Sequence, residues 1–340
     1  MADSDEFKFN ITWYDELACQ AREYMLTVFE SPRVPTEICI RDVKKKQTFL
    51  KRTISKDIQL EQMFKGAKVL IHARIYEVVG YGDSATRSFF ESHRSLITCI
   101  LPSRLYADFG AAIQLAQRSG FTVTKLKTFF DRHDDISLAV ELMGPVQGDD
   151  LWSLVFSGSS NPNMKLADVR YSNEETDSIF NEPSTTARLD EYSSLLLIKP
   201  HAMKEGNTGA ILSSVIDANF EISAIQTFQL SRVEVENFTE VYNGVLEPPS
   251  LYSSLTSELS SGQLVAVEVR AENCVEELRK LAGYYDVEVA QQLEPKSLRA
   301  RFGHDKVKNA VHVTDLPEDG VLESQYFFDI IIHTAKNSHK

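Results

Sequence analysis

The feature that most constrains the fold of this chain is an internal repeat. The run SLITCILPSRLYADFGAAIQLAQRSGFTVTKLKTFF (95–130) resembles SLLLIKPHAMKEGNTGAILSSVIDANFEISAIQTFQ (194–229). Each run has an apolar strand ending in a proline, a polar loop, a glycine near a helix, and a phenylalanine that leads a second strand. One single-residue gap aligns the two runs, so the sequence predicts two related domains in tandem. The simpler alternative is that both runs share one common core pattern.

The two copies are unequal in length. The second runs to about residue 329, whereas the first ends near residue 189, and its half at 157–186 is rich in turn-forming residues and is predicted to be loop-like. Before the repeat, residues 7–83 alternate apolar and polar side chains in strand-length runs, which predicts a small antiparallel barrel or sandwich closed by Gly80 and Gly82. The predicted domains are 1–91, 92–190 and 191–334, with a tail at 335–340, in an α+β fold.

Composition excludes several classes of protein. The net charge of −13 disfavours general binding to nucleic acid phosphates. No run approaches the roughly 18 apolar residues of a membrane span, and the acidic start MADSDEFKF lacks the apolar core of a signal peptide, so we expect neither. The four cysteines are scattered without a CxxC pair, which argues against a zinc site or disulfide framework and for a reducing compartment such as cytoplasm.

One region reverses the overall acidity. Residues 41–68 carry nine lysines and arginines against three acidic residues, a local excess of +6. Such a region could bind an acidic partner surface, and the alternative is a solvated strand-and-turn face.

The second copy concentrates the chemistry of phosphoryl transfer in SLRARFGHDKVKNAVHVTDLPEDGVLESQYFF (297–328). A neutral imidazole nitrogen is basic near neutral pH, so His312 can act as the nucleophile. A carboxylate such as Glu323, bonded to one imidazole nitrogen, would fix the tautomer and leave the other nitrogen free to attack phosphorus. Arg299, Asn309 and Thr314 flank the histidine, and Lys199 and Arg279 could supply further positive charge.

These motifs resemble those of nucleoside diphosphate kinases. That family has a strand ending in Lys-Pro and an Asn-x-x-His loop, which IKPHAM (198–203) and NAVHVTD (309–315) match. The resemblance covers 192–329 and implies a ferredoxin-like α/β domain that binds nucleoside tri- and diphosphates with Mg²⁺. It implies that His312 carries the phosphoryl group, that Glu323 orients it, and that nucleotide contacts come from Lys199, Tyr242, Leu251, Arg279, Arg299, Asn309 and Thr314, with Leu255 beside Leu251 near the base.

Four positions depart from the family pattern. His201 replaces the aspartate after Lys-Pro, and Val313 replaces the glycine after the active histidine. Tyr285, preceded by Tyr284, replaces a small polar residue near the phosphates, and Leu251 replaces the aromatic residue that stacks on the base. Each change is expected to weaken nucleotide binding, and none removes the nucleophile. Whether His312 is active or is retained only with the fold stays open.

The first copy lacks the corresponding groups. Leu101 stands at the place aligned with Lys199, and no histidine occurs between His133 and His201. Alignment of VRYSNEETDSIF with VHVTDLPEDGVL puts Arg170 in the place of the nucleophile. Arginine cannot accept a phosphoryl group by this route, so the first copy is predicted to be inactive and to serve as a packing module.

The whole chain resembles the homolog 7 group of this family, in which a DM10 domain precedes two kinase-like domains. The matching residues include Trp13-Tyr14, DVKKKQTFLKRT (42–53) and GYGD (80–83). The resemblance implies a cytoskeletal protein of the cilium or flagellum, in the lumen of axonemal doublet microtubules. Its implied partners are tubulin, which is acidic, other luminal proteins and the γ-tubulin complex.

Two functions remain in view. The preferred interpretation is a structural microtubule inner protein in which three domains act as a spacer. The alternative is an active nucleoside diphosphate kinase that works through phospho-His312 in the C-terminal domain only. Because the tandem copies can pack on each other within one chain, we expect a monomer or a component of a larger assembly.

Overall fold

The computed structural model describes residues 5–15, 20–31, 34–55, 58, 60, 63, 67–72, 74–145, 170–171 and 174–337. The chain divides into two compact units, Met1–Ser95 and Leu96–Lys340. The first division lies four residues beyond the predicted boundary at 91. The predicted boundary at 190 lies inside the second unit, and the predicted tail at 335–340 is described only to residue 337.

The N-terminal unit is one antiparallel sheet with the strand order β4-β3-β2-β1-β6-β5. It is therefore a single sheet and not the sandwich that was one of the two predicted forms. Alternating side chains such as Phe7 and Phe9 are buried, and both rings pack against Phe90 of the following helix. Gly82 lets the chain approach β1, because an added Cβ would lie 2.9 Å from Lys8 Cβ. The elements are β1 (Asp5–Asp15), β2 (Gln20–Ser31), β3 (Val34–Asp42), β4 (Thr48–Ile54), β5 (Lys68–Ile71), β6 (Arg74–Tyr81) and α1 (Ser84–His93).

The second unit begins with the first copy of the repeat. The first copy was predicted to be loop-like at 157–186. Residues 157–169 of that segment lie outside the described residues, but its later part contains the strand β10 and the helix α4. That part of the prediction is wrong, because Ile179 of the helix packs with Ile100 and Ala139 of the sheet. The elements are β7 (Arg94–Leu101), η2 (Ser103–Asp108), α2 (Phe109–Arg118), β8 (Thr122–Phe130), β9 (Ile136–Pro145), β10 (Arg170–Tyr171) and α4 (Glu174–Asn181).

The second copy adds a helical excursion between its second and third strands, where the first copy has only a tight turn at 131–135. Its elements are β11 (Ser193–Ile198), α5 (Pro200–Lys204), α6 (Thr208–Asp217), β12 (Glu221–Gln229), α7 (Arg232–Phe238), η4 (Glu240–Tyr242), α8 (Pro249–Leu259), β13 (Gln263–Arg270), α9 (Cys274–Ala282), α10 (Val287–Leu293), α11 (Leu298–Phe302), β14 (Val311–Val313), η5 (Pro317–Asp319), α12 (Gly320–Gln325), the π-helix η6 (Tyr326–Ile331) and α13 (Ile332–Asn337). The β-rich first unit and these two α/β copies confirm the predicted fold class.

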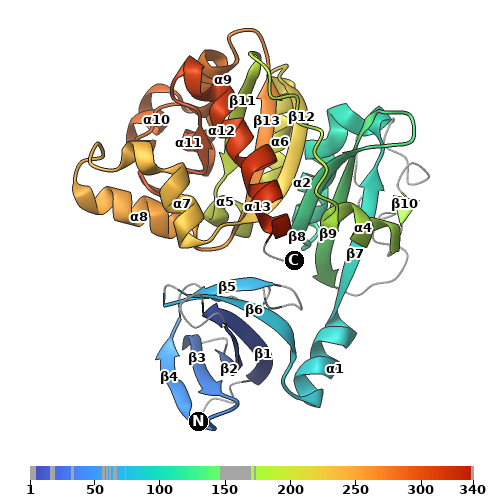
Figure 1. Ribbon diagram of the computed structural model, residues 1–340, viewed down its shortest axis with the longest axis vertical. Helices are drawn as coiled ribbons and strands as arrows, with labels where there is room; N and C mark the ends of the chain where they lie inside the picture. Colours follow the sequence, from blue (N-terminus) through green and yellow to red (C-terminus); the bar gives the residue numbers. More distant parts are fainter. Residues whose placement is uncertain are drawn as a thin grey trace. The chain divides into compact units, whose positions relative to one another are not determined.

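The two copies share one sheet (Figure 1). Its order is β10-β7-β9-β8-β12-β13-β11-β14, so the strands of the second copy mirror those of the first about the β8–β12 seam. The contacts across the seam are reciprocal. Leu126 N–H donates to Thr227 Oγ1, Ile225 N–H donates to Thr128 Oγ1, and both distances are 2.9 Å. The copies therefore pack around a local pseudo-two-fold axis.

The helices next to the seam pack almost backbone to backbone. A Cβ on Gly110 of α2 would lie 2.2 Å from Ser213 N, and a Cβ on Gly209 of α6 would lie 2.1 Å from Gln114 N. These are the two glycines that the repeat aligns. Each is required by the close approach of α2 and α6, which bury one continuous core beneath the sheet.

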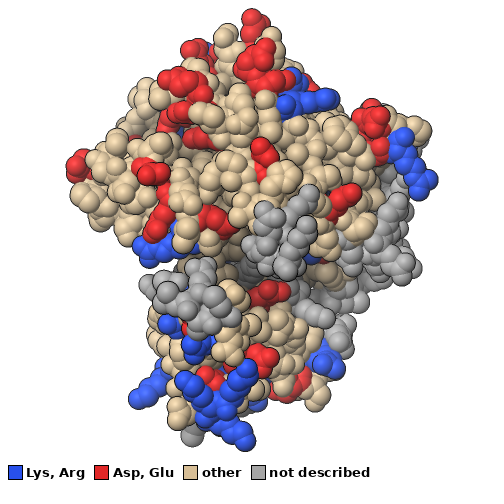
Figure 2. Space-filling model, viewed as in Figure 1, with Lys and Arg blue, Asp and Glu red and all other residues tan. Residues whose placement is uncertain are grey.

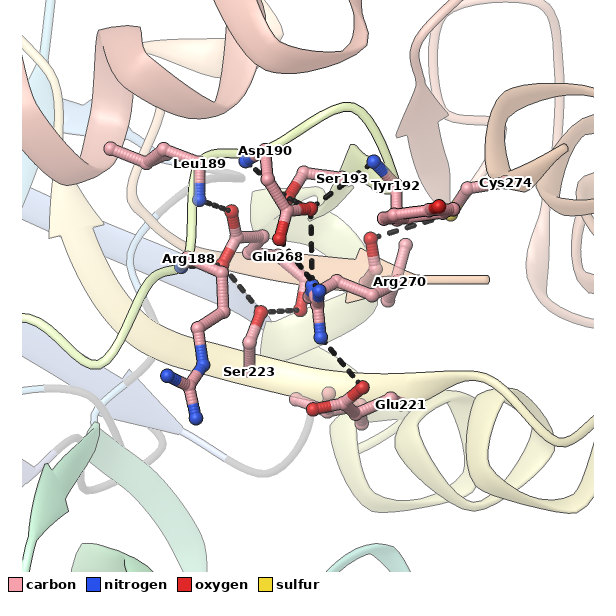
Figure 3. Close-up of polar contacts among 12 residues, drawn as sticks. Arg188, Leu189, Asp190, Tyr192, Ser193, Glu221, Ser223, Glu268, Arg270 and Cys274 are labelled. Carbon is pink, nitrogen blue, oxygen red and sulfur yellow. Dashed lines mark hydrogen bonds and ion pairs between the residues drawn. The ribbon is translucent and has the colours of Figure 1, made fainter. Parts of the chain in front are cut away.

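A buried carboxylate is also duplicated. Glu141 and Glu268 lie in the third strand of each copy, and each accepts a hydrogen bond from a hydroxyl at a β-bulge, Thr124 or Ser223. Glu268 also accepts from the backbone N–H groups of residues 188 and 189, at 2.7 and 2.8 Å, and so anchors the segment that joins the copies (Figure 3). Arg270 pairs with Asp190 beside it. The sequence signal is the shared motif LAVEL (138–142) and VAVEV (265–269), which the repeat analysis missed because the helical excursion separates it from the aligned run.

Candidate active site

The edge of the shared sheet brings the two motifs of the second copy together. β14 runs antiparallel to β11, with His312 opposite Leu197. The end of β11 therefore meets the start of β14, and Lys199 N–H donates to Ala310 O at 2.9 Å. The lysine after the strand and the Asn-x-x-His loop are direct neighbours.

His312 is held by a carboxylate from α12. Its Nε2 lies 2.9 Å from Glu323 Oε2, and the buried hydroxyl of Thr314 donates to the same oxygen at 2.9 Å. Because a carboxylate accepts, Nε2 carries a proton, and in the neutral ring Nδ1 then holds the lone pair. Within the described residues no hydrogen bond engages Nδ1. The rings of Phe238 and Tyr242 pack edge-on against His312 at 5.2 and 6.3 Å between centroids, and these contacts restrict the imidazole orientation.

A strained turn precedes His312. Val311 N–H donates to Asn309 O at 2.9 Å, and Ala310 between them has φ of +68°. This γ-turn with positive φ is rare for a residue with a Cβ. It turns the Asn309 side chain inward, where Nδ2 donates to Tyr285 O at 3.2 Å. Asn309 Oδ1 is buried and has no partner among the described residues.

Two buried cations lie beside this turn. Lys199 Nζ donates to Val307 O at 2.9 Å, and burial, with the Arg299 charge, lowers the Lys199 pKa to about 7. Arg299 Nη1 donates to Gly283 O at 2.8 Å, and burial lowers the Arg299 pKa to about 10. Arg299 Nε has no partner among the described residues. A buried excess of donors and positive charge suits an anionic ligand.

The outer side of the site is organised by Asp315, which sequence reasoning did not assign. Its carboxylate forms an ion pair with Arg279, its backbone oxygen accepts from Arg279 Nη1 at 2.9 Å, and its Oδ2 accepts from Tyr242 OH at 2.7 Å. Burial, with Glu323 and Asp315 nearby, raises the Tyr242 pKa. Two residues expected to contact phosphates thus share one internal carboxylate. The aspartate is the last residue of NAVHVTD, so its place in the motif was the available signal.

Three of the four substituted positions, Tyr285, Leu251 and Val313, contact or adjoin the elements of this cluster. Tyr285 covers Arg299, with the guanidinium carbon 5.7 Å from the ring centroid. Leu251 is half-buried in the first turn of α8, the helix that packs on α5 and α7. Val313 is buried in β14 opposite Leu196. The structure therefore brings together Lys199, Tyr242, Arg279, Arg299, Asn309, His312, Thr314 and Glu323, and leaves Leu251 on the adjoining helix.

The corresponding edge of the first copy carries no such group at the nucleophile's position. Arg170 in β10 lies opposite Ile100, as His312 lies opposite Leu197. Ile100 and Leu197 both face away from the core beneath α2 and α6. The sheet register therefore gives the same correspondence of Arg170 with His312 as the sequence alignment.

The position equivalent to Lys199 differs from the one expected. Lys199 is the N-cap of α5, and the N-cap of η2 is Pro102. Leu101 instead corresponds to Ile198, because both side chains point into the core beneath α2 and α6. The assignment to Leu101 is thus wrong by one residue, and the first copy has a proline where the second has an ammonium group.

Neither a membrane span nor a metal cluster was found in the described ranges. No helix there has both the length and the apolar character needed to cross a bilayer. No group of three or more histidine, cysteine, aspartate or glutamate side chains there has the arrangement of a metal site.

Comparison with known proteins finds relatives of the second copy. The nucleoside diphosphate kinase family model matches residues 192–330. The nucleoside diphosphate kinase of Aquifex aeolicus is 35% identical over 39% of this chain and 92% of its own length. A crystal structure of the Aquifex aeolicus enzyme covers 41% of this chain and 96% of that chain, with 33% identity and a TM-score of 0.39.

Similarity to two mammalian proteins extends over nearly the whole chain. Nucleoside diphosphate kinase homolog 7 of Rattus norvegicus is 34% identical over 96% of this chain and 94% of its own length, and the Mus musculus protein matches equally. This similarity includes the N-terminal unit and the first copy as well as the candidate site. The chain therefore belongs to the nucleoside diphosphate kinase homolog 7 family.

Proposed function

We propose that the C-terminal domain transfers the γ-phosphoryl group of a nucleoside triphosphate to a nucleoside diphosphate through phospho-His312. The observation that carries this proposal is the His312–Glu323–Thr314 arrangement. A neutral imidazole with Nε2–H bonded to a carboxylate presents a free Nδ1 lone pair for attack on phosphorus. Attack forms the Nδ1–P bond and breaks the bond from phosphorus to the leaving diphosphate oxygen. Transfer to a second diphosphate reverses these steps.

The surrounding residues fit a nucleotide. The unpartnered Arg299 Nε can donate to a phosphate oxygen, and the unpartnered Asn309 Oδ1 can accept from a sugar hydroxyl. Lys199 adds a positive charge that phosphate would stabilise, since an anion raises a lowered lysine pKa. Mg²⁺, carried by the nucleotide phosphates, would neutralise part of their charge.

Phosphohistidine formation tests this function. Purified full-length protein is incubated with γ-labelled Mg-ATP, alongside His312→Ala and the control His304→Ala, which removes an exposed histidine. We expect acid-labile label on the wild type and on the His304 variant, none on the His312 variant, and loss of label after addition of a nucleoside diphosphate. Unlabelled wild-type protein would refute the proposal.

The carboxylate should matter through its charge. We expect Glu323→Gln to slow phosphohistidine formation by about 100-fold, because the amide can still accept from Nε2–H but no longer stabilises the positive charge that develops on the ring. Thr314→Val, which removes one hydrogen bond to that carboxylate and preserves side-chain volume, should cost about tenfold or less. Single-turnover labelling measures both rates, and equal rates for wild type and Glu323→Gln would contradict this role.

We also propose a structural role for the chain as a microtubule inner protein of ciliary and flagellar doublet microtubules, with tubulin, neighbouring luminal proteins and the γ-tubulin complex as partners. The specific support is a surface of the N-terminal unit. Lys44, Lys45, Lys46, Lys51 and Arg52 are exposed on β4 and the turn before it, and basic side chains gather on this unit (Figure 2). An acidic protein surface would complement them.

Localisation in ciliated cells tests the structural role. The variant His312→Ala should localise to axonemes like the wild type, because the nucleophile takes no part in docking. Charge reversal of Lys44, Lys45 and Lys46 to glutamate should release the protein. The matched control reverses Lys280, Lys296 and Lys306, which are exposed on the other unit. Axonemal loss in the His312 variant, or retention of the Lys44–46 variant, would count against this role.

A further inference from the structure

His201 is a buried histidine close to the candidate site. It lies in the first turn of α5, where an aspartate would be expected, and is 5% exposed. Its Nδ1 lies 2.8 Å from Glu258 Oε1, and its own backbone N–H donates to the same oxygen at 3.0 Å. Burial raises the Glu258 pKa, but the hydrogen bonds from the His201 side chain and backbone, with the Lys308 charge nearby, outweigh burial and hold that pKa below its ordinary value. Glu258 is therefore an ionised acceptor, and Nδ1 must donate to it.

The second nitrogen of the ring bonds the active-site turn. Ala310 N–H donates to His201 Nε2 at 3.2 Å, across 109 residues of sequence. A backbone N–H can only donate, so Nε2 must hold a lone pair. The two partners together select the neutral imidazole protonated on Nδ1.

The amide that His201 accepts from is the central one of the strained turn. Ala310 is fully buried, with φ of +68°, and connects Asn309 to the strand that carries His312. Among the described residues, two hydrogen bonds hold its peptide groups from outside the turn: Ala310 N–H donates to His201 Nε2, and Lys199 N–H donates to Ala310 O. A strained backbone persists only where its surroundings enforce it. Loss of the imidazole acceptor would leave a buried donor unpaired and favour relaxation of the turn.

We propose that His201, held by Glu258, is a positioning residue that keeps the Asn309–Val311 turn in the conformation needed for phosphoryl transfer to His312. This inference rests on the proposed kinase function for its kinetic consequence. His201 also links α8, which carries Glu258 and Leu251, to the turn that carries Asn309. The two elements that are expected to contact the nucleotide are therefore held by the same histidine.

Protonation would disable this brace. With a second proton, Nε2 becomes a donor that faces the donor N–H of Ala310. The charged groups around the ring are Glu258, the buried Lys199 two residues earlier in the chain, and Asp305 and Lys308, which interact with the His201–Glu258 pair electrostatically. His304 lies 5.8 Å away between ring centroids and bonds Glu205.

The test compares three variants of the full chain. His201→Gln keeps an acceptor that can reach Ala310 N–H and cannot gain a proton, His201→Leu removes the acceptor, and His304→Gln changes the neighbouring exposed histidine as control. Two quantities are measured: the single-turnover rate of phosphohistidine formation at saturating Mg-ATP, and hydrogen exchange at the Ala310 amide. Exchange at the seam amides of Leu126 and Ile225 reports whether each variant keeps its fold.

We expect His201→Leu to lose about 100-fold in rate, because misplacing a reacting group by about an ångström has effects of that size. Its Ala310 amide should exchange faster while the seam amides stay protected. His201→Gln should recover at least about tenfold of the lost rate and most of the protection, because it restores an acceptor for the Ala310 amide. His304→Gln should match the wild type.

An unchanged rate and unchanged Ala310 protection in His201→Leu would overturn the proposal, as would equal losses in the Leu and Gln variants. If wild-type protein forms no phosphohistidine, the kinase function fails, but exchange at Ala310 still decides the positioning. Loss of protection in the Leu variant with retention in the Gln variant then supports it, and equal protection overturns it.

Discussion

Alanine at Gly209 is expected to destabilise the Leu96–Lys340 unit by about 3 kcal/mol or more. The added Cβ would lie 2.1 Å from Gln114 N and 2.8 Å from Gly110 O, both of them backbone atoms that no side-chain rotation can move. The helices would have to separate and lose packing in the core that both copies share. Gly110→Ala should behave alike, with its Cβ 2.2 Å from Ser213 N. Urea unfolding of the full chain, followed by hydrogen exchange at the seam amides, measures the loss.

Gly80→Ala is the matched control, because an added Cβ there meets nothing within 4 Å. We expect its unfolding midpoint to stay near that of the wild type. Seam amides that remain equally protected in the Gly209 variant would show that α2 and α6 can move apart at low cost. The close packing of α2 on α6 would then not be what holds the two copies together.

The Lys199→Met variant is expected to be more stable than the wild type below pH 7, by about 2–4 kcal/mol. Lys199 is 1% exposed, and burial lowers its pKa from 10.5 to about 7. Below about pH 7 the folded protein carries the full cost of a buried ammonium group. Between pH 7 and 10.5 the unfolded chain binds one more proton at this residue than the folded chain, so wild-type stability rises with pH. The advantage of the methionine variant should therefore shrink across this window and vanish above it.

Lys308→Met, which removes an exposed lysine from the same region, is the control and should show no such pH-dependent gain. Urea unfolding at pH 6 and pH 9.5 measures the difference. The same Lys199 variant should gain less stability from Mg-ADP than the wild type, because it lacks the charge that phosphate would stabilise. A Lys199→Met protein less stable than the wild type at pH 6 would contradict the burial argument. The stability cost of a buried ammonium group is retained in a protein when its charge serves a ligand.

Several features of the site could be predicted because they are local in sequence. His312, Thr314 and Glu323 lie within one segment of 12 residues. The sequence predicts a strand followed at once by the start of a helix, and this order brings the three side chains close together. The repeat predicted both tandem copies and marked Gly110 and Gly209. A separate alignment, of VRYSNEETDSIF with VHVTDLPEDGVL, paired Arg170 with His312, in agreement with the sheet register.

Other features depended on contacts between distant segments. Asp315 was present in the quoted motif, but only folding brings Arg279 of α9 and Tyr242 of η4 to its carboxylate. The buried Glu268 acquires its role from the backbone of residues 188 and 189. The one-residue error at Leu101 arose because strand length, not the aligned proline, sets which residue caps the following helix.

By itself, the sequence determined the duplicated α/β pattern and the β-rich first unit, and it predicted His312 as the candidate nucleophile with Glu323 as its orienting carboxylate. Periodicity and short motifs carry this information because each depends on residues within one or two elements. Only the tertiary structure decided that the copies join edge to edge in one sheet, and that His201, which the sequence marked only as a replacement for an aspartate, bonds the turn before His312. The physical reason is that hydrogen bonds and close packing between segments about 100 residues apart depend on how the elements dock, and a local pattern does not record docking.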